Sequence, residues 1–285
     1  MPIDLAYLQQ WVGKRETVSD TLALTPMNAL AAALDHDRQP FAPGDALPPL
    51  WHWLYFLPVH RQSLVGPDGH PKRGGFLPPV QLPRRMWAGS QLLFSRRLRA
   101  GDKITRFSTI EDVTYKNGRS GDLVFVKVLH EVHDAAGLAM TERQDIVYRD
   151  HPAASEVPPI LRAAPESAQW KREIHPDPVL LFRYSALTLN GHRIHYDRPY
   201  AVEQEGYPGL VVHGPLLATL LLDLLHRELP EETVKAYSFR ARSPVIDTAA
   251  FFVCGQTDGD QGKTVRLWIA GNDGTLRMEA DAVLA

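Results

Sequence analysis

The sequence contains very little cysteine, little net charge and no long apolar run. Of the 285 residues only Cys254 is a cysteine, so no internal disulfide can form and a reducing compartment is expected. The formal net charge of −2 argues against the broad basic surface that binds nucleic acid. The longest apolar run, GPLLATLLLDLL, is too short to span a bilayer and contains Asp223. The opening MPIDLAYLQQWVGKRE does not have the pattern of a secretory signal, so we predict a cytoplasmic protein without membrane or nucleic-acid partners.

Prolines gather between residues 150 and 178. Proline removes a backbone donor and disfavours helix before it, so this stretch is expected to be an irregular connection. The chain is long enough for two domains of ordinary size, and its 44% apolar and 22% charged residues are typical of a globular protein. We therefore predict two domains, residues 1–160 and residues 161–285.

The first domain is expected to contain one helix and then an antiparallel meander. TPMNALAAALDH favours a helix, with Thr25 as its cap and Pro26 at its first position. Four β-rich runs separated by turn residues follow from about residue 85: MWAGSQLLFSRRL, DKITRFSTIEDVTYKNG, GDLVFVKVLHEVHDAAG and LAMTERQDIVYRD. Residues 39–84 are rich in proline, glycine and aromatics, which predicts long loops. Their aromatic side chains are interpreted as core or as an acyl pocket: Trp51, Trp53, Tyr55 and Phe56.

The second domain repeats this order. VLLFRYSALTL is predicted to be a strand, and GPLLATLLLDLLHRELP is predicted to be a buried helix because it is apolar nearly all round. Four further strands are expected in VKAYSFRARSPV, AAFFVCGQTDG, KTVRLWIAGNDG and LRMEADAVLA. Two such units predict a duplicated α+β protein, and a sheet curled around one apolar helix is the hot-dog architecture. The second unit fits that architecture better than the first, because the first contains the long insertion.

The segment YSALTLNGHRIHYDRPY gathers the polar side chains that are most suited to chemistry. Asn190 and His195 are five residues apart, a spacing that suits a bent segment with both side chains in one pocket. Imidazole exchanges protons near neutral pH, whereas an amide can only orient a water molecule. The alternative is that Asn190 caps a turn and His195 is a hydrogen-bonded core or surface histidine.

A second motif, YPGLVVHGPL, places His213 and Gly214 at the start of the predicted buried helix. A glycine N–H at the positive end of a helix dipole can stabilise the enolate oxygen of a thioester. The alternative is that Gly214 is only a flexible helix entry. His192, His195 and His213 have neither cysteine partners nor the HExxH pattern, so we expect no metal.

These segments, from FRYSALTLNGHRIHYDRPYA to YPGLVVHGPL, resemble the hydroxyacyl-thioester dehydratase type 2 family of MaoC-like hydratases. MWAGSQLLFSRRLRAGDKI and YKNGRSGDLVFVKV extend the resemblance over nearly the whole chain. It implies a double hot-dog fold, hydro-lyase activity without a cofactor, and catalysis by His195, Asn190 and Gly214, with Asn190 orienting the water. Asn190 occupies the position of the aspartate in the wider pattern. His195 then moves protons alone, or His192 or Asp197 assists it.

The resemblance also implies the substrate class. A short branched dicarboxylic acyl-CoA is expected, either itaconyl-CoA or mesaconyl-C4-CoA, hydrated to citramalyl-CoA in itaconate degradation. Arginines near the motif could bind CoA phosphates or a carboxylate, or could pair with acids such as Asp197. We expect four residues to bind substrate: Arg183, Arg193, Tyr184 and His213. The alternatives are a general (R)-3-hydroxyacyl thioester dehydratase, a hot-dog thioesterase and an acyl-CoA sensor, and the chain is expected to be a monomer or a homodimer.

Overall fold

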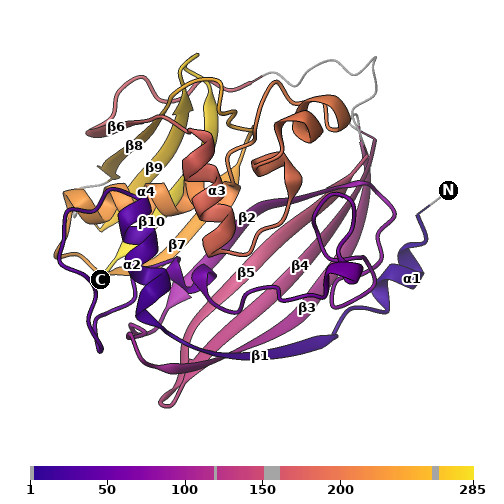
Figure 1. Cartoon of the computed structure of the whole chain (residues 1–285), viewed down its shortest axis with the longest axis horizontal. Coiled ribbons are helices and arrows are strands. Elements are labelled where there is room, and N and C mark those ends of the chain that lie inside the picture. Colours follow the sequence, from indigo (N-terminus) through magenta and orange to yellow (C-terminus); the bar gives the residue numbers. More distant parts are fainter. Residues whose placement is uncertain (1–2, 119–120, 151–160, 259–262) are drawn as a thin grey trace.

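The computed structural model describes residues 3–118, 121–150, 161–258 and 263–285, and its strands form one antiparallel sheet (Figure 1). The strands are β1 (Arg15–Thr21), β2 (Arg84–Phe94), β3 (Lys103–Gly118), β4 (Gly121–Asp134), β5 (Gly137–Arg149), β6 (Trp170–Ile174), β7 (Val234–Ala241), β8 (Phe251–Asp258), β9 (Thr264–Gly271) and β10 (Leu276–Leu284). The helices are α1 (Leu5–Gln9), α2 (Leu24–Ala33), α3 (Pro178–Leu187) and α4 (Gly214–Glu228). Short helical turns are η1 (Trp51–Leu54), η2 (Gln62–Leu64), η3 (Arg193–His195) and η4 (Tyr200–Gln204).

The two halves of the sheet have the same topology. The strand order is β1-β3-β4-β5-β2 followed by β7-β10-β9-β8-β6. Each half has five strands, and from its outer edge to the centre of the sheet these are the first, third, fourth, fifth and second strands of that half in chain order. β2 and β7 join the halves as an antiparallel pair. Gly89 lies at this junction, where a Cβ atom would approach the carbonyl oxygen of Phe239 to 2.3 Å. The repeated order confirms the predicted α+β double hot-dog fold. The domain boundary predicted after residue 160 lies outside the described residues and stays a prediction.

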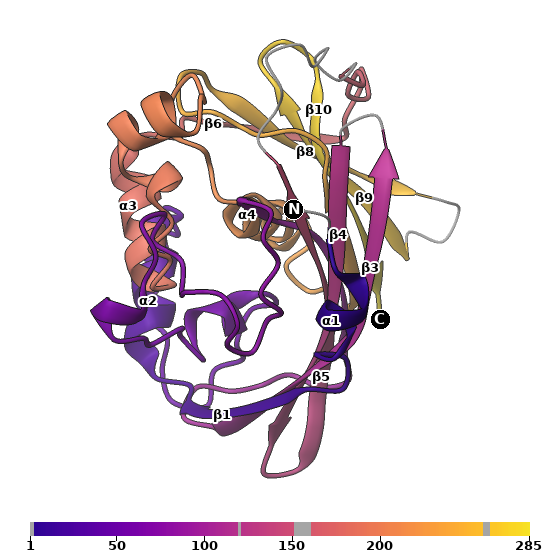
Figure 2. The ribbon, with the colours of Figure 1, turned by 90° about the vertical axis from the view of Figure 1, so that its right-hand side faces the viewer.

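α4 lies on the concave side of the sheet, and α2 and α3 cover it from the other side (Figure 2). Its apolar residues between Leu216 and Leu225 are buried on every face, because the sheet and the outer helices both pack against it. The predicted buried helix is therefore confirmed. Among the described residues, no helix combines the length and the apolarity needed to cross a bilayer.

In the first half, loops take the place of a central helix. The segment between α2 and β2 runs inside the curl of the sheet (Figure 2), and α2 itself packs on α3 and η1. Trp51, Tyr55 and Phe56 are buried in the main apolar core, so they are core residues. The predicted first helix is confirmed, but its predicted cap is wrong. The helix begins at Leu24 with Ala23 at the cap position, and Thr25 lies inside it.

The strand predicted over VLLFRYSALTL is wrong, because this segment is helix α3. Asp177 accepts hydrogen bonds from the N–H groups of Val179 and Leu180 at 2.8 and 3.1 Å, and Pro178 occupies the first helical position. The connection predicted between residues 150 and 178 also contains structure. Trp170–Ile174 forms the edge strand β6, which pairs with β8. Strand β1 was not predicted either.

Candidate active site

The motif that contains Asn190 and His195 is a tight bend at the end of α3. The N–H of Asn190 donates to the carbonyl of Ser185 at 2.8 Å, and Leu189 adopts the left-handed conformation with φ of 47°. This is the pattern of a Schellman helix end, with leucine at the position that usually holds glycine. The Asn190 side-chain oxygen then accepts from the N–H of His192 at 3.1 Å. The oxygen that we expected to orient water therefore holds the bend, which ends in the turn η3.

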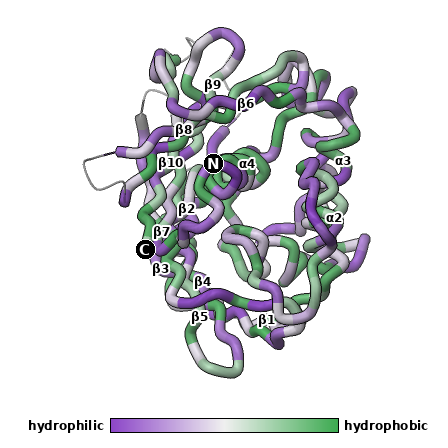
Figure 3. The backbone as a smooth tube through the Cα atoms, turned by 90° about the vertical axis from the view of Figure 1, so that its left-hand side faces the viewer, coloured by the Kyte–Doolittle hydropathy of each residue, from purple (hydrophilic) through white to green (hydrophobic). Residues whose placement is uncertain are grey.

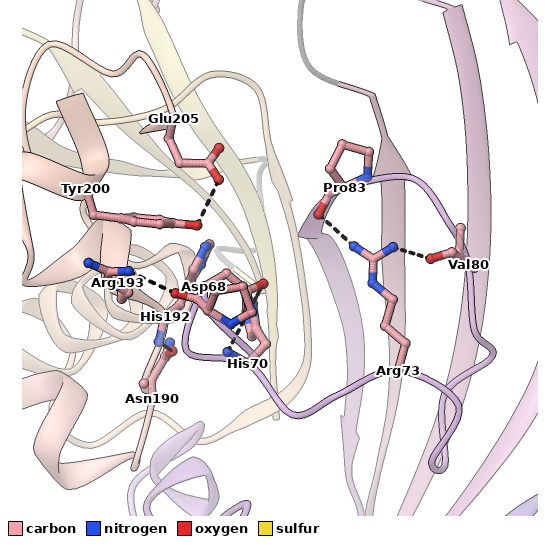
Figure 4. Close-up of polar contacts among 12 residues, drawn as sticks. Asp68, His70, Arg73, Val80, Pro83, Asn190, His192, Arg193, Tyr200 and Glu205 are labelled. Carbon is pink, nitrogen blue, oxygen red and sulfur yellow. Dashed lines mark hydrogen bonds and ion pairs between the residues drawn. The ribbon is translucent and has the colours of Figure 1, made fainter. Parts of the chain in front are cut away.

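A loop of the first half, residues 66–70, packs against this bend and is hydrogen-bonded to it (Figure 4). Arg193 donates its backbone N–H to the carbonyl of Asp68 at 2.9 Å and its guanidinium to the carbonyl of Pro67 at 3.0 Å. Gly69 and Gly191 meet backbone to backbone, since a Cβ atom on Gly69 would lie 1.7 Å from the carbonyl oxygen of Gly191. The insertion in the first half thus positions the bend that carries His195.

His195 is buried, with a side chain held in one orientation. Its Nδ1 donates to the carbonyl of Val211 at 2.6 Å, which leaves Nε2 as the unprotonated nitrogen of a neutral ring. Burial lowers the pKa of His195 to about 4, although the bond to Val211 opposes the shift. The imidazole is therefore neutral at pH 7, and Nε2 is available to accept a proton.

His213 lies face to face with His195, with ring centroids 3.8 Å apart. Its Nε2 is hydrogen-bonded to Ser185 Oγ at 2.8 Å, and Tyr184 packs edge-on against its ring. Its Nδ1 is buried without a hydrogen-bond partner among the described residues, and burial holds its pKa well below the usual range. The stacked ring of His213 therefore fixes the distance between His195 and the start of α4.

Gly214 begins α4, and the space beside it is open. A Cβ atom added there would meet nothing within 4 Å, and within the described chain no acceptor binds its N–H. The first N–H groups of a helix have no partner inside the helix and carry its positive partial charge. A carbonyl oxygen of a ligand can therefore approach Gly214, next to the ring stacked on His195.

A second group of polar side chains lies on the outer side of the bend (Figure 4). Asp68 accepts from the N–H and from Nδ1 of His70 at 3.0 Å each, and the rings of His70 and His192 lie 4.1 Å apart. The rings of His192 and His195 are 5.4 Å apart. Burial and the neighbouring imidazoles lower the pKa of His192 to about 2. The ligand atoms of Asp68, His70 and His192 are close enough together to hold a cation.

The four residues predicted to bind substrate lie in different surroundings. His213 is buried against His195, and Tyr184 is buried against the ring of His213. Arg193 is paired with Asp197 at 2.7 Å and stacks over Tyr200, and Arg183 is exposed on α3. Two of the four, Tyr184 and His213, thus lie in the cluster around His195. Arg193 stabilises the bend, and Arg183 lies outside the cluster.

Sequence reasoning did not find Ser185, the Val211 carbonyl, Asp68 or His70. Ser185 had a signal, because it lies on the helix that Asp177 and Pro178 start. A backbone carbonyl gives no signal in a sequence. Asp68 and His70 are more than 100 positions before the bend, so only the folded chain brings them to it.

Residues 50–247 match the hydroxyacyl-thioester dehydratase type 2 family. The chain is 44% identical to the mesaconyl-C(4)-CoA hydratase of Chloroflexus aurantiacus over 96% of both sequences. Among solved structures, a MaoC-like dehydratase from Phytophthora capsici matches with a TM-score of 0.72 at 14% identity, covering 99% of each chain. A conserved hypothetical protein of Mycobacterium tuberculosis, described as a double hotdog fold, matches with a TM-score of 0.59 at 14% identity over 96% of each chain.

The fold and the buried imidazole beside a helix N-terminus define a hot-dog protein of the hydratase and dehydratase class. This chain belongs to the hydroxyacyl-thioester dehydratase type 2 family, as its match over residues 50–247 shows. The family resemblance predicted from the motifs is confirmed.

Proposed function

We propose that this protein catalyses the reversible hydration of a short branched dicarboxylic enoyl-CoA, mesaconyl-C4-CoA or itaconyl-CoA, to citramalyl-CoA. The observation that carries the proposal is the neutral His195 imidazole, tied through Nδ1 to Val211 and stacked on the residue before Gly214. The 44% identity to a mesaconyl-C(4)-CoA hydratase supports this substrate class.

In the proposed mechanism for mesaconyl-C4-CoA, the thioester carbonyl occupies the open space beside Gly214 and accepts its N–H. His195 Nε2 takes a proton from a water molecule while the resulting hydroxide forms a bond to Cβ. The electron pair of the double bond moves to the thioester oxygen, where the Gly214 N–H and the α4 dipole stabilise the enolate. The enolate then takes a proton at Cα, which completes the addition of one water.

The same His195 supplies the second proton in this scheme. Asn190 has no acidic proton to give, and its oxygen is engaged with His192. Asp197 accepts two hydrogen bonds from Arg193, which holds the pKa of this carboxyl below its usual range. Asp197 is therefore ionised and already paired with Arg193, whereas the imidazolium formed on His195 is next to the enolate.

The test is incubation of the protein with mesaconyl-C4-CoA, itaconyl-CoA and crotonyl-CoA, with mass spectrometry of the products. We expect a gain of one water on at least one of the dicarboxylic thioesters. Hydration of crotonyl-CoA in preference to both would support the general 3-hydroxyacyl dehydratase instead. Release of free CoA, measured with a thiol reagent, would identify a thioesterase, and saturable binding without turnover would identify a sensor.

We also propose a cytoplasmic enzyme that acts as a monomer or a homodimer. The single cysteine, Cys254, is buried, which suits a reducing compartment. The two halves already form one continuous sheet within the chain, so a monomer has both hot-dog units. Size-exclusion chromatography with light scattering distinguishes the two oligomeric states.

A further inference from the structure

A small cavity opens between the two halves, on the outer side of the bend. Its volume is about 40 Å³, room for a few water-sized groups at about 10–15 Å³ each. It is therefore too small for CoA and large enough for one compact polar group. The first half contributes Asp68, His70, Arg84 and Arg85, and the second contributes His192, Glu205 and Tyr207. Both carboxylates of the lining have partners, since Asp68 accepts from His70 and Glu205 pairs with Arg84.

Among the described residues of this cavity, Arg85 is the arginine that forms no ion pair. Arg84 beside it pairs with Glu205 at 3.1 Å, and the nearby Arg73 donates to the carbonyls of Val80 and Pro83 (Figure 4). Within the described ranges no carboxylate lies at ion-pair distance from Arg85, whose side chain is half-buried beside the Tyr148 hydroxyl. A half-buried guanidinium without a counter-ion is matched to an anionic ligand, and its planar fork suits a carboxylate.

The cavity adjoins the proposed reacting centre. His192 lines it, and the His192 ring lies 5.4 Å from the ring of His195. In a mesaconyl-type thioester the free carboxylate is bonded directly to Cβ, the carbon that receives the hydroxyl group. A water held by His195 and a carboxylate in this cavity would therefore be neighbours on the same carbon.

We propose that Arg85 binds the free carboxylate of the acyl group, so that this cavity selects dicarboxylic enoyl-CoA over monocarboxylic enoyl-CoA. This inference rests on the proposed hydration of an enoyl-CoA. A cation held by Asp68, His70 and His192 is the competing occupant. Both oxygens of Asp68 already accept from His70, and the positive charge of Arg85 in the same cavity opposes a metal ion.

The test compares substrates that differ only in the carboxylate. Arg85→Gln should lower kcat/KM for mesaconyl-C4-CoA on the order of 10- to 100-fold, the size expected for a charge-assisted hydrogen bond. Its kcat/KM for crotonyl-CoA should stay near the wild-type value, and Arg85→Lys should be intermediate for mesaconyl-C4-CoA. Arg143→Gln is the matched control, because Arg143 is an exposed arginine on the same sheet that pairs with Glu111. Arg143→Gln should leave kcat/KM unchanged for both mesaconyl-C4-CoA and crotonyl-CoA.

A second measurement uses unreactive thioesters. Succinyl-CoA and butyryl-CoA have four-carbon acyl chains, but only the former carries a carboxylate on Cβ. Succinyl-CoA should be the stronger inhibitor of crotonyl-CoA hydration by the wild type, and Arg85→Gln should remove that difference. Equal losses on both substrates, or an unchanged inhibitor ratio, would overturn the assignment, as would activity that depends on added zinc and is lost with a chelator. Failure of the wild type to hydrate any enoyl-CoA would instead reject the proposed function.

Discussion

Each half of the sheet buries polar side chains, and Glu142 in the first half differs from the stacked histidines of the second half in how completely it is hydrogen-bonded. In the first half, Glu142 on β5 is almost fully buried and its two oxygens accept four hydrogen bonds. The donors are His52, Trp53, Ser90 and Gln144, at 2.9–3.1 Å. In the second half, His195 and His213 each have one nitrogen without a hydrogen bond to any described residue.

We interpret Glu142 as a structural polar group and the stacked histidines as the functional pair. A buried polar atom without a partner costs about 1–3 kcal/mol, and His213 Nδ1 is such an atom. Among the described residues Arg106 Nε and Trp268 Nε1 are others, so the lack of a partner alone does not identify the site. Glu142 has no lone pair left for a ligand, and the bonds and charge of His52 lower its pKa to about 2 although burial raises it. The surroundings of His195 instead favour the neutral ring that a base requires.

In Figure 3, where the backbone is coloured by hydropathy, much of the tube along α4 is hydrophobic and the edge strand β1 is largely hydrophilic. Polar residues of the candidate site come from the bend at residues 189–195 and the loop at residues 66–70, and Ser185 and His213 add to them from α3 and from the position before α4. Substitutions at Glu142 or in the candidate site test whether stability and activity depend on different groups.

The largest effect is expected at the incompletely bonded histidine. His195→Gln keeps the size of the side chain but removes the proton carrier, so kcat for enoyl-CoA hydration should fall by ~10²- to 10⁴-fold. Circular dichroism and the urea unfolding midpoint should stay close to the wild-type values. A variant with near wild-type turnover would show that His195 is a core histidine, as the alternative reading of the motif has it.

The converse change is Glu142→Leu, which should destabilise the protein without changing the turnover of the folded molecules. It leaves the donors of His52, Trp53 and Ser90 buried without an acceptor, so the free energy of unfolding should fall by about 3 kcal/mol or more. Turnover per folded molecule should stay near the wild type. Glu111→Gln removes an exposed carboxylate paired with Arg143 and should shift stability by less than about 1 kcal/mol in urea titrations. A stable Glu142→Leu enzyme that is inactive would contradict the division.

A smaller effect is expected at the start of α4. Gly214→Ala fits the backbone, since nothing lies within 4 Å of the added Cβ, and alanine is a good helix residue. The methyl group would occupy the space assigned to the thioester carbonyl, so kcat/KM should fall by about tenfold or more, within the range seen when an oxyanion contact is lost. Gly75→Ala also adds a methyl to open space, in a loop away from the site, and should leave kcat/KM unchanged. Equal activity of the two variants would remove Gly214 from the mechanism.

The strands, the buried helix and the motif residues could be predicted because their signals are local. Alternation of apolar residues and turn pairs marks strands such as β4, and the all-round apolar face marks α4. α3 was misread because valine, leucine and phenylalanine at its start favour a strand, while the stronger signal, Asp177 followed by Pro178, was not used.

The remaining parts of the site depend on tertiary contacts. Asp68 and His70 reach the bend because they lie on the insertion of the first half, and Arg85 reaches the same cavity from β2. Asn190 also differs from the expectation, since its side-chain oxygen accepts from the His192 N–H. A spacing of five residues identifies the two side chains but not the atoms they face.

The smallest expected effect is a displacement of the acid limb of activity. The hydration reaction needs neutral His195, whose pKa is lowered to about 4 by burial, so kcat/KM should decline with a midpoint near pH 4. An ordinary histidine would give a midpoint near 6.5. The unfolded chain binds this proton below pH about 6.5, so the protein also loses stability as the pH falls from there to about 4. His130 in the first half, with a pKa lowered to about 4 by burial, adds to that loss. Brief assays after a pH jump, with refolded controls at pH 7, separate the reversible protonation of His195 from unfolding. A midpoint near 6.5 in such assays would mean that the working His195 is exposed to solvent, and its incomplete hydrogen bonding would then need no functional explanation.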